Sequence, residues 1–111
     1  MREPNKALCD LVKKILDENK AEDIVSIDIY NKSSLCDYMI VATGTSSRHL
    51  KALAEKVVLI LKKQNHPQLS IEGQNNSSWV LIDTGDVIVH LFQHEMRDLF
   101  NLEAMWNKKK D

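Results

Sequence analysis

Two aspartates in the second half of the chain, Asp83 and Asp86, are the residues best suited to chemistry. They flank Thr84-Gly85 within the string W-V-L-I-D-T-G-D-V-I-V-H-L-F over residues 79–92. A close pair of carboxylates can bind Mg²⁺ and so support nucleotidyl or phosphoryl transfer. The same pair can form a negative site for a basic partner, or can merely stabilise a turn, because aspartate hydrogen-bonds to its own backbone there. The residue types alone leave these three interpretations open.

A β-hairpin must position the two aspartates. Strand-forming runs flank Thr84-Gly85, and glycine accepts the positive φ of a tight turn. If the loop is those two residues, Asp83 lies opposite Asp86 and Trp79 lies opposite His90. Alternation along the strands then predicts an aliphatic core face, made of Val80, Ile82, Val87, Val89 and Leu91. The other face needs a cover of helices, a partner or both, and carries Trp79, Leu81, Ile88, His90 and Phe92.

Further catalytic arrangements have little support in the sequence. Gly44-Thr45 resembles the turn of a nucleotidyltransferase only loosely, and the D-x-x-D spacing does not place two carboxylates on one face of a strand. Ser78, His90 and Asp83 can be assembled into a triad on paper, but no nucleophile elbow accompanies them. We therefore expect no catalysis, no cofactor and no metal. A metal-dependent nucleotidyltransferase that uses Asp83 and Asp86 is the alternative.

Composition indicates one domain of ordinary globular type. The chain has 111 residues, of which 43% are hydrophobic and 28% charged, so neither disorder nor low complexity is indicated. No apolar run approaches the roughly 20 residues of a membrane span. The N-terminus lacks the apolar stretch of a signal peptide, so we expect a cytoplasmic protein without membrane contact. Cys9 and Cys36 lack metal-binding or redox spacing and are expected to be free thiols.

Hydrophobic periodicity predicts an α/β fold with the element order αββαβββα and a mixed five-stranded sheet flanked by helices. Helices are expected over residues 6–19, from Ser46 or Ser47 to residue 65, and over residues 95–106. Strands are expected over residues 23–30, 37–43 and 69–72, followed by the hairpin. No internal repeat divides the chain, so residues 1–111 are expected to form a single domain.

Charge is unevenly distributed along the chain. Five cations lie between residues 48 and 63, namely Arg48, Lys51, Lys56, Lys62 and Lys63. Six carboxylates lie between residues 72 and 103, namely Glu72, Asp83, Asp86, Glu95, Asp98 and Glu103. An acidic surface repels phosphate backbones, so a basic protein is a better expected partner than RNA. Direct RNA binding through the five cations is a further alternative, which predicts a steep salt dependence.

Aromatic and acidic residues together predict a partner-binding surface. Trp79, His90, Leu99 and Trp106 are of types found at binding hot spots. Asp83, Asp86 and Glu103 are expected to surround them and meet basic side chains. Arg97 is either an internal counter-ion to Glu103 or Asp98, or a direct partner contact.

Four strings carry a resemblance to a known family. They are D-Y-M-I-V-A-T-G-T-S-S-R-H over residues 37–49, E-G over 72–73, the hairpin string, and R-D-L-F-N-L-E-A-M-W over 97–106. Together they resemble the ribosomal silencing factor RsfS (Iojap-like) family. The resemblance implies a nucleotidyltransferase-like α/β fold without known transferase activity. It also implies a factor that binds the fourteenth protein of the large ribosomal subunit, blocks joining of the small subunit and lowers translation when nutrients are short. Members of the family can form homodimers.

Two positions depart from the family pattern. Thr84 stands where aromatic or aliphatic residues are common, and Phe100 stands where a tyrosine is frequent. Phe100 keeps the ring but lacks the hydroxyl, so this residue is not expected to make any hydrogen bond that the tyrosine hydroxyl makes in relatives. We expect exchange of Asp83 and Asp86 for lysine to abolish ribosome binding and to leave the fold intact.

Overall fold

The computed structural model describes residues 3–66, 69–73 and 78–99. In chain order the elements are α1 (Lys6–Glu18), β1 (Glu22–Asp28), β2 (Tyr38–Gly44), α2 (Ser47–Lys63), β3 (Ser70–Glu72), β4 (Trp79–Asp83), β5 (Val87–Gln93) and α3 (His94–Leu99). This order confirms the predicted αββαβββα pattern. The helix expected over residues 95–106 begins at His94, and its second half lies outside the described residues.

All five strands form one sheet in the order β1-β2-β5-β4-β3. The strands β2 and β5 pair in parallel, and every other neighbouring pair is antiparallel, so the predicted mixed sheet is confirmed. The strand expected over residues 37–43 is β2, which lies between β1 and β5 and is buried from Met39 to Gly44. A nearly continuous apolar run suits such a strand because both of its faces are covered.

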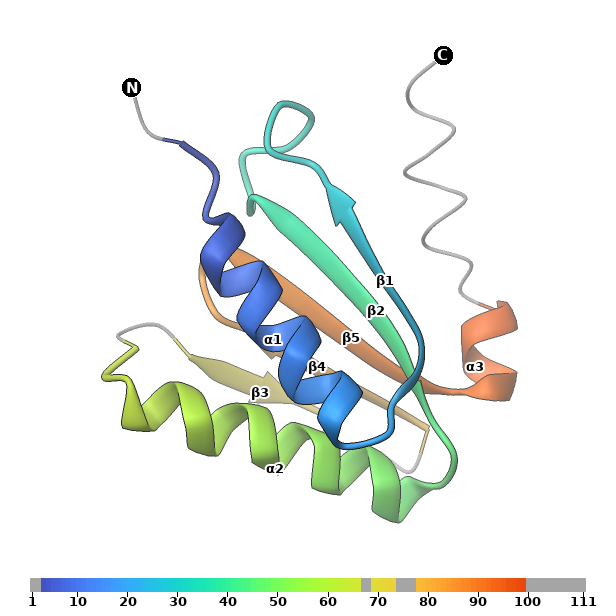
Figure 1. The fold of residues 1–111 in the computed structure, drawn as a ribbon. Coiled ribbons are helices and arrows are strands. Elements are labelled where there is room, and N and C mark those ends of the chain that lie inside the picture. Colours follow the sequence, from blue (N-terminus) through green and yellow to red (C-terminus); the bar gives the residue numbers. More distant parts are fainter. Residues whose placement is uncertain (1–2, 67–68, 74–77, 100–111) are drawn as a thin grey trace.

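The helices α1 and α2 lie over one face of the sheet (Figure 1). Each has an apolar stripe at helical spacing, and each begins at a capping side chain. Asn5 Oδ1 accepts a hydrogen bond from the Leu8 N–H (3.1 Å), and Ser46 Oγ accepts one from the His49 N–H (3.1 Å). The sheet presents its predicted aliphatic face to these helices. All five of those side chains are buried, namely Val80, Ile82, Val87, Val89 and Leu91.

The opposite face of the sheet holds a second apolar cluster. Val41 and Phe92 are buried within it, and Met96 from α3 packs against it. Trp79 and Ile88 contribute to the same cluster but stay partly exposed. The two faces of the sheet therefore differ in how completely the described residues are buried.

The hairpin register differs from the predicted one. The Thr84 N–H donates to the Val87 carbonyl (3.0 Å) and the Val87 N–H donates to Thr84 Oγ1 (3.2 Å), so the two-residue loop is Gly85-Asp86. Gly85 has a φ of 92°, which suits the first loop position of a type II′ turn. The predicted pairing of Asp83 with Asp86 and of Trp79 with His90 is therefore wrong.

The observed register pairs Trp79 with Phe92, Leu81 with His90, and Asp83 with Ile88. Relative to the prediction, the strands have slipped by two residues, and such a slip returns every side chain to its original face. The predicted division into two faces is correct for this reason. Repulsion between directly opposed aspartates, which the predicted register implied, does not arise.

Within the described segments, no helix combines the length and apolarity that crossing a membrane would demand.

Candidate partner-binding surface

A row of partly exposed side chains follows β4 on the second face of the sheet. Trp79, Leu81 and Asp83 alternate with buried residues along the strand, so all three point to the same side. His90 lies beside Leu81 on β5 and is also partly exposed. We call Trp79, Leu81, Asp83 and His90 the β4 surface. Sequence reasoning placed Trp79, Leu81 and His90 on one face, and the structure adds Asp83 to them.

Trp79 is held in place by close backbone packing. Gly73 has a φ of 82°, and a Cβ built on it would lie 2.6 Å from the Trp79 carbonyl oxygen and 3.1 Å from the indole Cε3 atom. Only glycine permits both that φ and that approach. Gly73 therefore lies directly against Trp79, and this close packing restricts the position of the indole on that side.

His90 contributes a neutral ring to the β4 surface. Its imidazole stacks on Phe92, with centroids 5.9 Å apart and an interplanar angle of 13°. Burial lowers the pKa of His90, and its buried Nδ1 atom has no hydrogen-bond partner among the described residues. The imidazole therefore presents a largely apolar, uncharged contact at neutral pH.

The two hairpin aspartates have separate surroundings. Asp83 Oδ1 accepts a hydrogen bond from the Gly85 N–H (2.8 Å), the local turn contact that aspartate favours. Asp86 reaches the start of α1 instead, where its Oδ2 atom accepts from Asn5 Nδ2 (3.0 Å). The backbone carbonyl of Asp86 accepts from the N–H of Asp37 (2.7 Å). Asp83 therefore belongs to the β4 surface, whereas Asp86 joins the hairpin to α1.

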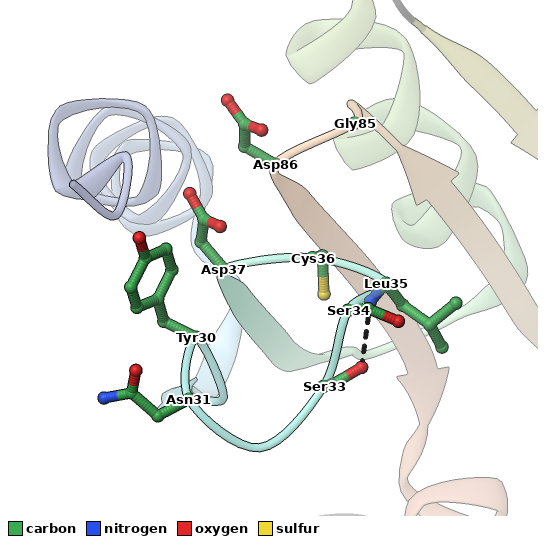
Figure 2. Close-up of a pocket in the computed structure, with 9 residues that line it drawn as sticks. All are labelled: Tyr30, Asn31, Ser33, Ser34, Leu35, Cys36, Asp37, Gly85 and Asp86. Atoms are coloured by element: carbon green, nitrogen blue, oxygen red, sulfur yellow. Dashed lines mark hydrogen bonds between the residues drawn. The ribbon is translucent and has the colours of Figure 1, made fainter. Parts of the chain in front are cut away.

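Asp37 is a structural residue that sequence reasoning did not single out. Its side chain is buried, with 1% of the residue exposed, and its Oδ2 atom accepts from the backbone N–H of Asn5 (2.8 Å). Figure 2 shows Asp37 and Asp86 side by side near the start of α1, while Leu35 points away from them. Asn5 lies 32 residues from Asp37 in the chain, so no local pattern announces this contact.

This arrangement argues against exchanging both hairpin aspartates together, because Asp86 has a structural contact. A lysine at position 86 would lose the contact with the Asn5 amide and place a cation at the positive end of α1. Among the described residues, Asp83 bonds to the turn and not to α1. The charge of Asp83 can therefore be changed without loss of the contact between the hairpin and α1.

Arg97 connects α3 to the sheet. Its Nη1 atom donates to Thr43 Oγ1 (2.9 Å) and to the carbonyl oxygen of Asp23. Asp23 has a φ of 48° at an irregularity of β1. Its carbonyl oxygen, which accepts the bond, belongs to a residue 74 positions before Arg97 in the chain. Both acceptors are neutral groups of the sheet, so these two bonds hold α3 to it.

Three further predicted site residues lie at the end of the chain. Leu99 is the last residue of α3, close behind Arg97. Glu103 and Trp106 lie outside the described residues. The assignment of these three residues to the partner site stays a prediction.

The turn before α2 contains Gly44-Thr45, whose sequence resembles a nucleotidyltransferase turn only loosely. A Cβ on Gly44 would lie 2.7 Å from the Leu50 Cδ2 atom, so a larger residue there would require Leu50 to shift. The Thr45 N–H donates to His49 Nδ1 (2.9 Å), and His49 Nε2 in turn lies 3.0 Å from the Asn19 carbonyl. This turn is thus closed by its own side chains and tied to the end of α1. Across the described residues, no three His, Cys, Asp or Glu side chains gather as a possible metal site.

The cations that suggested RNA binding lie on α2. All five are exposed, namely Arg48, Lys51, Lys56, Lys62 and Lys63. Since α2 covers the first face of the sheet, these cations and the β4 surface belong to different sides of the sheet (Figure 1).

Comparison with known proteins places this geometry in a family. The chain matches the family model described as ribosomal silencing factor during starvation over residues 2–111. A ribosomal silencing factor RsfS from Zymomonas mobilis is 43% identical, with 89% of this chain and 74% of that protein covered. One from Haemophilus influenzae is 39% identical, with 90% of this chain and 98% of that protein covered.

Solved structures agree with the sequence relatives. A crystal structure of a protein from Chromobacterium violaceum superposes with a TM-score of 0.88 at 37% identity, covering 96% of this chain and 88% of that one. A crystal structure from Bacillus halodurans gives a TM-score of 0.82 at 32% identity, covering 92% and 95%. The predicted fold is confirmed by both, and the chain belongs to the ribosomal silencing factor (RsfS) family.

Proposed function

We propose that the protein represses translation by binding the large ribosomal subunit through its fourteenth protein and keeping the small subunit from joining. The observation that carries this proposal is the β4 surface, a preorganised row of partly exposed apolar groups that ends in a carboxylate. Such a combination suits a basic protein partner, because aromatic anchors supply contact area and carboxylates attract cations. The site of action is the cytoplasm, where bacterial subunits assemble.

The names of relatives support a role at the ribosome. The two bacterial relatives described above are named ribosomal silencing factors, and these names support a role in the regulation of translation. A mouse relative, 32% identical over 87% of this chain, is named mitochondrial assembly of ribosomal large subunit protein 1. That name ties one relative to the large subunit, and it favours the same subunit as the partner here.

In the proposed complex, Trp79 and His90 fill the apolar centre of the interface, together with Leu99 and Trp106 from the end of the chain. Asp83 meets lysine or arginine side chains of the partner, and Glu103 extends the acidic rim. Asp86 and Arg97 act mainly within the protein, by holding α1 and α3 to the sheet. Silencing is steric in this proposal: the bound domain occupies the space that the small subunit needs, and no covalent bond changes.

The proposal includes no catalytic step. A nucleotidyltransferase that used both hairpin aspartates would need their carboxylates to converge on one metal ion. Asp83 instead bonds to the turn and Asp86 to Asn5, which favours a structural and binding role for the pair. Calorimetric titration with Mg²⁺ and nucleoside triphosphates tests this directly. We expect no heat of binding, and saturable heat would favour the enzyme.

Charge variants of Asp83 test the proposed interface. Asp83→Asn keeps the oxygen that accepts from Gly85 but removes the charge, and Asp83→Lys reverses the charge. Co-sedimentation with purified large subunits is expected to weaken in the first variant and to disappear in the second. Glu55→Lys, at an exposed position of α2, serves as a control with the same charge change and is expected to bind normally. Unchanged binding by Asp83→Lys would remove Asp83 from the interface.

A further inference from the structure

Leu35 is the most exposed large apolar side chain among the described residues. It is 74% exposed, against 48% for Leu59, the other large apolar residue that is exposed there. A single exposed leucine is common on protein surfaces and needs no function by itself. The loop, the surface hollows and the carboxylates around Leu35 indicate a role in binding.

The loop that carries Leu35, residues 29–37 between β1 and β2, is held by its own hydrogen bonds. The Leu35 N–H donates to Ser33 Oγ (3.0 Å), and the Ser33 N–H donates to the Ile29 carbonyl (2.9 Å). The next residue, Cys36, is buried in the second apolar cluster. Leu35 is therefore presented outward by a loop whose conformation is already fixed. Such preorganisation lowers the entropic cost of binding.

Surface hollows flank Leu35 on two sides. One, of about 510 Å³, is lined by the 29–37 loop and by Gly85 and Asp86, as Figure 2 shows. The other, of about 390 Å³, lies between Leu35, Leu69 and Asp83. Both hollows include Gly85, so Leu35 is an apolar projection between two depressions at the turn end of the sheet. Neighbouring side chains of a partner have room to settle on either side of it.

Leu35 also continues the β4 surface. Asp83, the last residue of that row, lines the same hollow as Leu35. Charge at this end of the molecule is mostly negative: Asp83 and Asp86 border the hollows, and exposed Lys32 is the cation of the loop. An apolar projection beside carboxylates complements a segment that offers an apolar pocket among lysines or arginines.

We infer that Leu35 is an anchor of the interface, which docks with Asp83 onto a basic protein segment of the ribosomal partner. This inference rests on the proposed function and adds the 29–37 loop to its contact surface. RNA is a poor occupant because the bordering carboxylates repel phosphates. A second copy of the chain is also disfavoured, because a two-fold contact about Leu35 brings the Asp83 and Asp86 carboxylates of both copies together.

A matched pair of leucine variants tests the inference. Leu35→Ser and Leu59→Ser remove the same apolar group from two exposed positions, the second of them on the outer surface of α2. Dissociation constants for purified large subunits are measured for both variants and the wild type, with thermal midpoints to establish folding. We expect about tenfold weaker binding for Leu35→Ser, which corresponds to a loss of about 1.4 kcal/mol at one interface side chain, and unchanged binding for Leu59→Ser.

The outcomes separate this inference from the proposed function. If the wild type binds large subunits and Leu35→Ser binds equally well, Leu35 is not an anchor and the inference fails alone. If the wild type does not bind large subunits, the proposed function fails as well. Light scattering of both variants measures self-association. A change in oligomeric state confined to Leu35→Ser, without loss of ribosome binding, would assign the loop to a homodimer contact and overturn the inference.

Discussion

The two faces of the sheet are built from the same strands but differ in chemistry. The face under α1 and α2 is aliphatic and buried, so its residues serve the stability of the fold. The opposite face carries an indole, an imidazole and a carboxylate that are partly exposed among buried neighbours. Alternation along β4 separates the two sets residue by residue: Val80 and Ile82 point one way, and Trp79, Leu81 and Asp83 point the other.

This difference shows how a small domain can combine a stable core with a binding surface. The strand is fixed by its buried residues, so the partly exposed side chains of the β4 surface are held in place by the fold. Substitutions on the first face are therefore expected to change stability, and those in the β4 surface are expected to change mainly partner binding.

The largest expected effect contrasts two adjacent residues of β4. Ile82 is fully buried, so Ile82→Ala is expected to lower the free energy of unfolding by about 2–5 kcal/mol. Leu81→Ala, on the partly exposed face, is expected to cost about 1 kcal/mol or less and to weaken large-subunit binding. Urea denaturation and co-sedimentation measure the two effects. Equal losses of stability in both variants would erase the distinction between the faces.

A smaller effect concerns the contact between α1 and the hairpin turn. Asn5→Ala removes both the cap of α1 and the hydrogen bond to Asp86, and is expected to lower the free energy of unfolding by about 1–2 kcal/mol. Ser46→Ala removes only the cap of α2 among the described hydrogen bonds, so it should cost about 1 kcal/mol. Denaturant unfolding compares the two. A smaller loss in Asn5→Ala would show that the link to the turn contributes nothing.

Arg97 tests whether α3 belongs to the stable part or to the binding part. Arg97→Met keeps the apolar stem and removes the bonds to Thr43 and Asp23, so stability should fall by about 1 kcal/mol. Arg97→Lys keeps the charge but loses the fork of donors, and a similar fall is expected. Thermal unfolding and large-subunit affinity are measured together. Weaker binding of both variants with unchanged stability would make Arg97 a direct partner contact instead.

The smallest effect is a pH dependence that belongs to the second face. Burial lowers the pKa of folded His90 below the ordinary value of 6.5, so the unfolded chain takes up this proton first as the pH falls. The contribution of His90 to stability is complete above that value and declines below it. In His90→Gln, the fall in unfolding free energy between about pH 7 and pH 5.5 should be shallower. Identical pH profiles for the wild type and the variant would mean that His90 titrates normally in the folded state.

Local sequence patterns were sufficient to predict the helices and strands and the two faces of the hairpin. Helical periodicity located α1 and α2, and alternation located β4 and β5, because these signals arise within a dozen residues. The register was missed because Gly85, with its positive φ, takes the first position of the loop instead of the second. Thr84 is the last residue before the loop and bonds to Val87 through both its N–H and its hydroxyl, which the sequence alone did not indicate.

Long-range contacts account for the rest of what sequence reasoning missed. Asp86 bonds to a residue 81 positions away, and Arg97 to one 74 positions away, so their neighbours in sequence gave no indication of either contact. Leu35 is exposed because the 29–37 loop folds back on Ile29, which composition cannot reveal. The sequence therefore indicated which residue types form the surface, while the tertiary fold determines which of them are available to a partner.

Hydroxyl-radical footprinting with and without purified large subunits tests the central claim most directly, because it reports the exposure of individual side chains. We predict that the subunit protects Trp79 and Leu81 from oxidation and leaves Leu59 on α2 as reactive as in the free protein. Protection of Leu59 with unchanged reactivity at Trp79 and Leu81 would contradict the account and would place the partner on the helical side of the molecule.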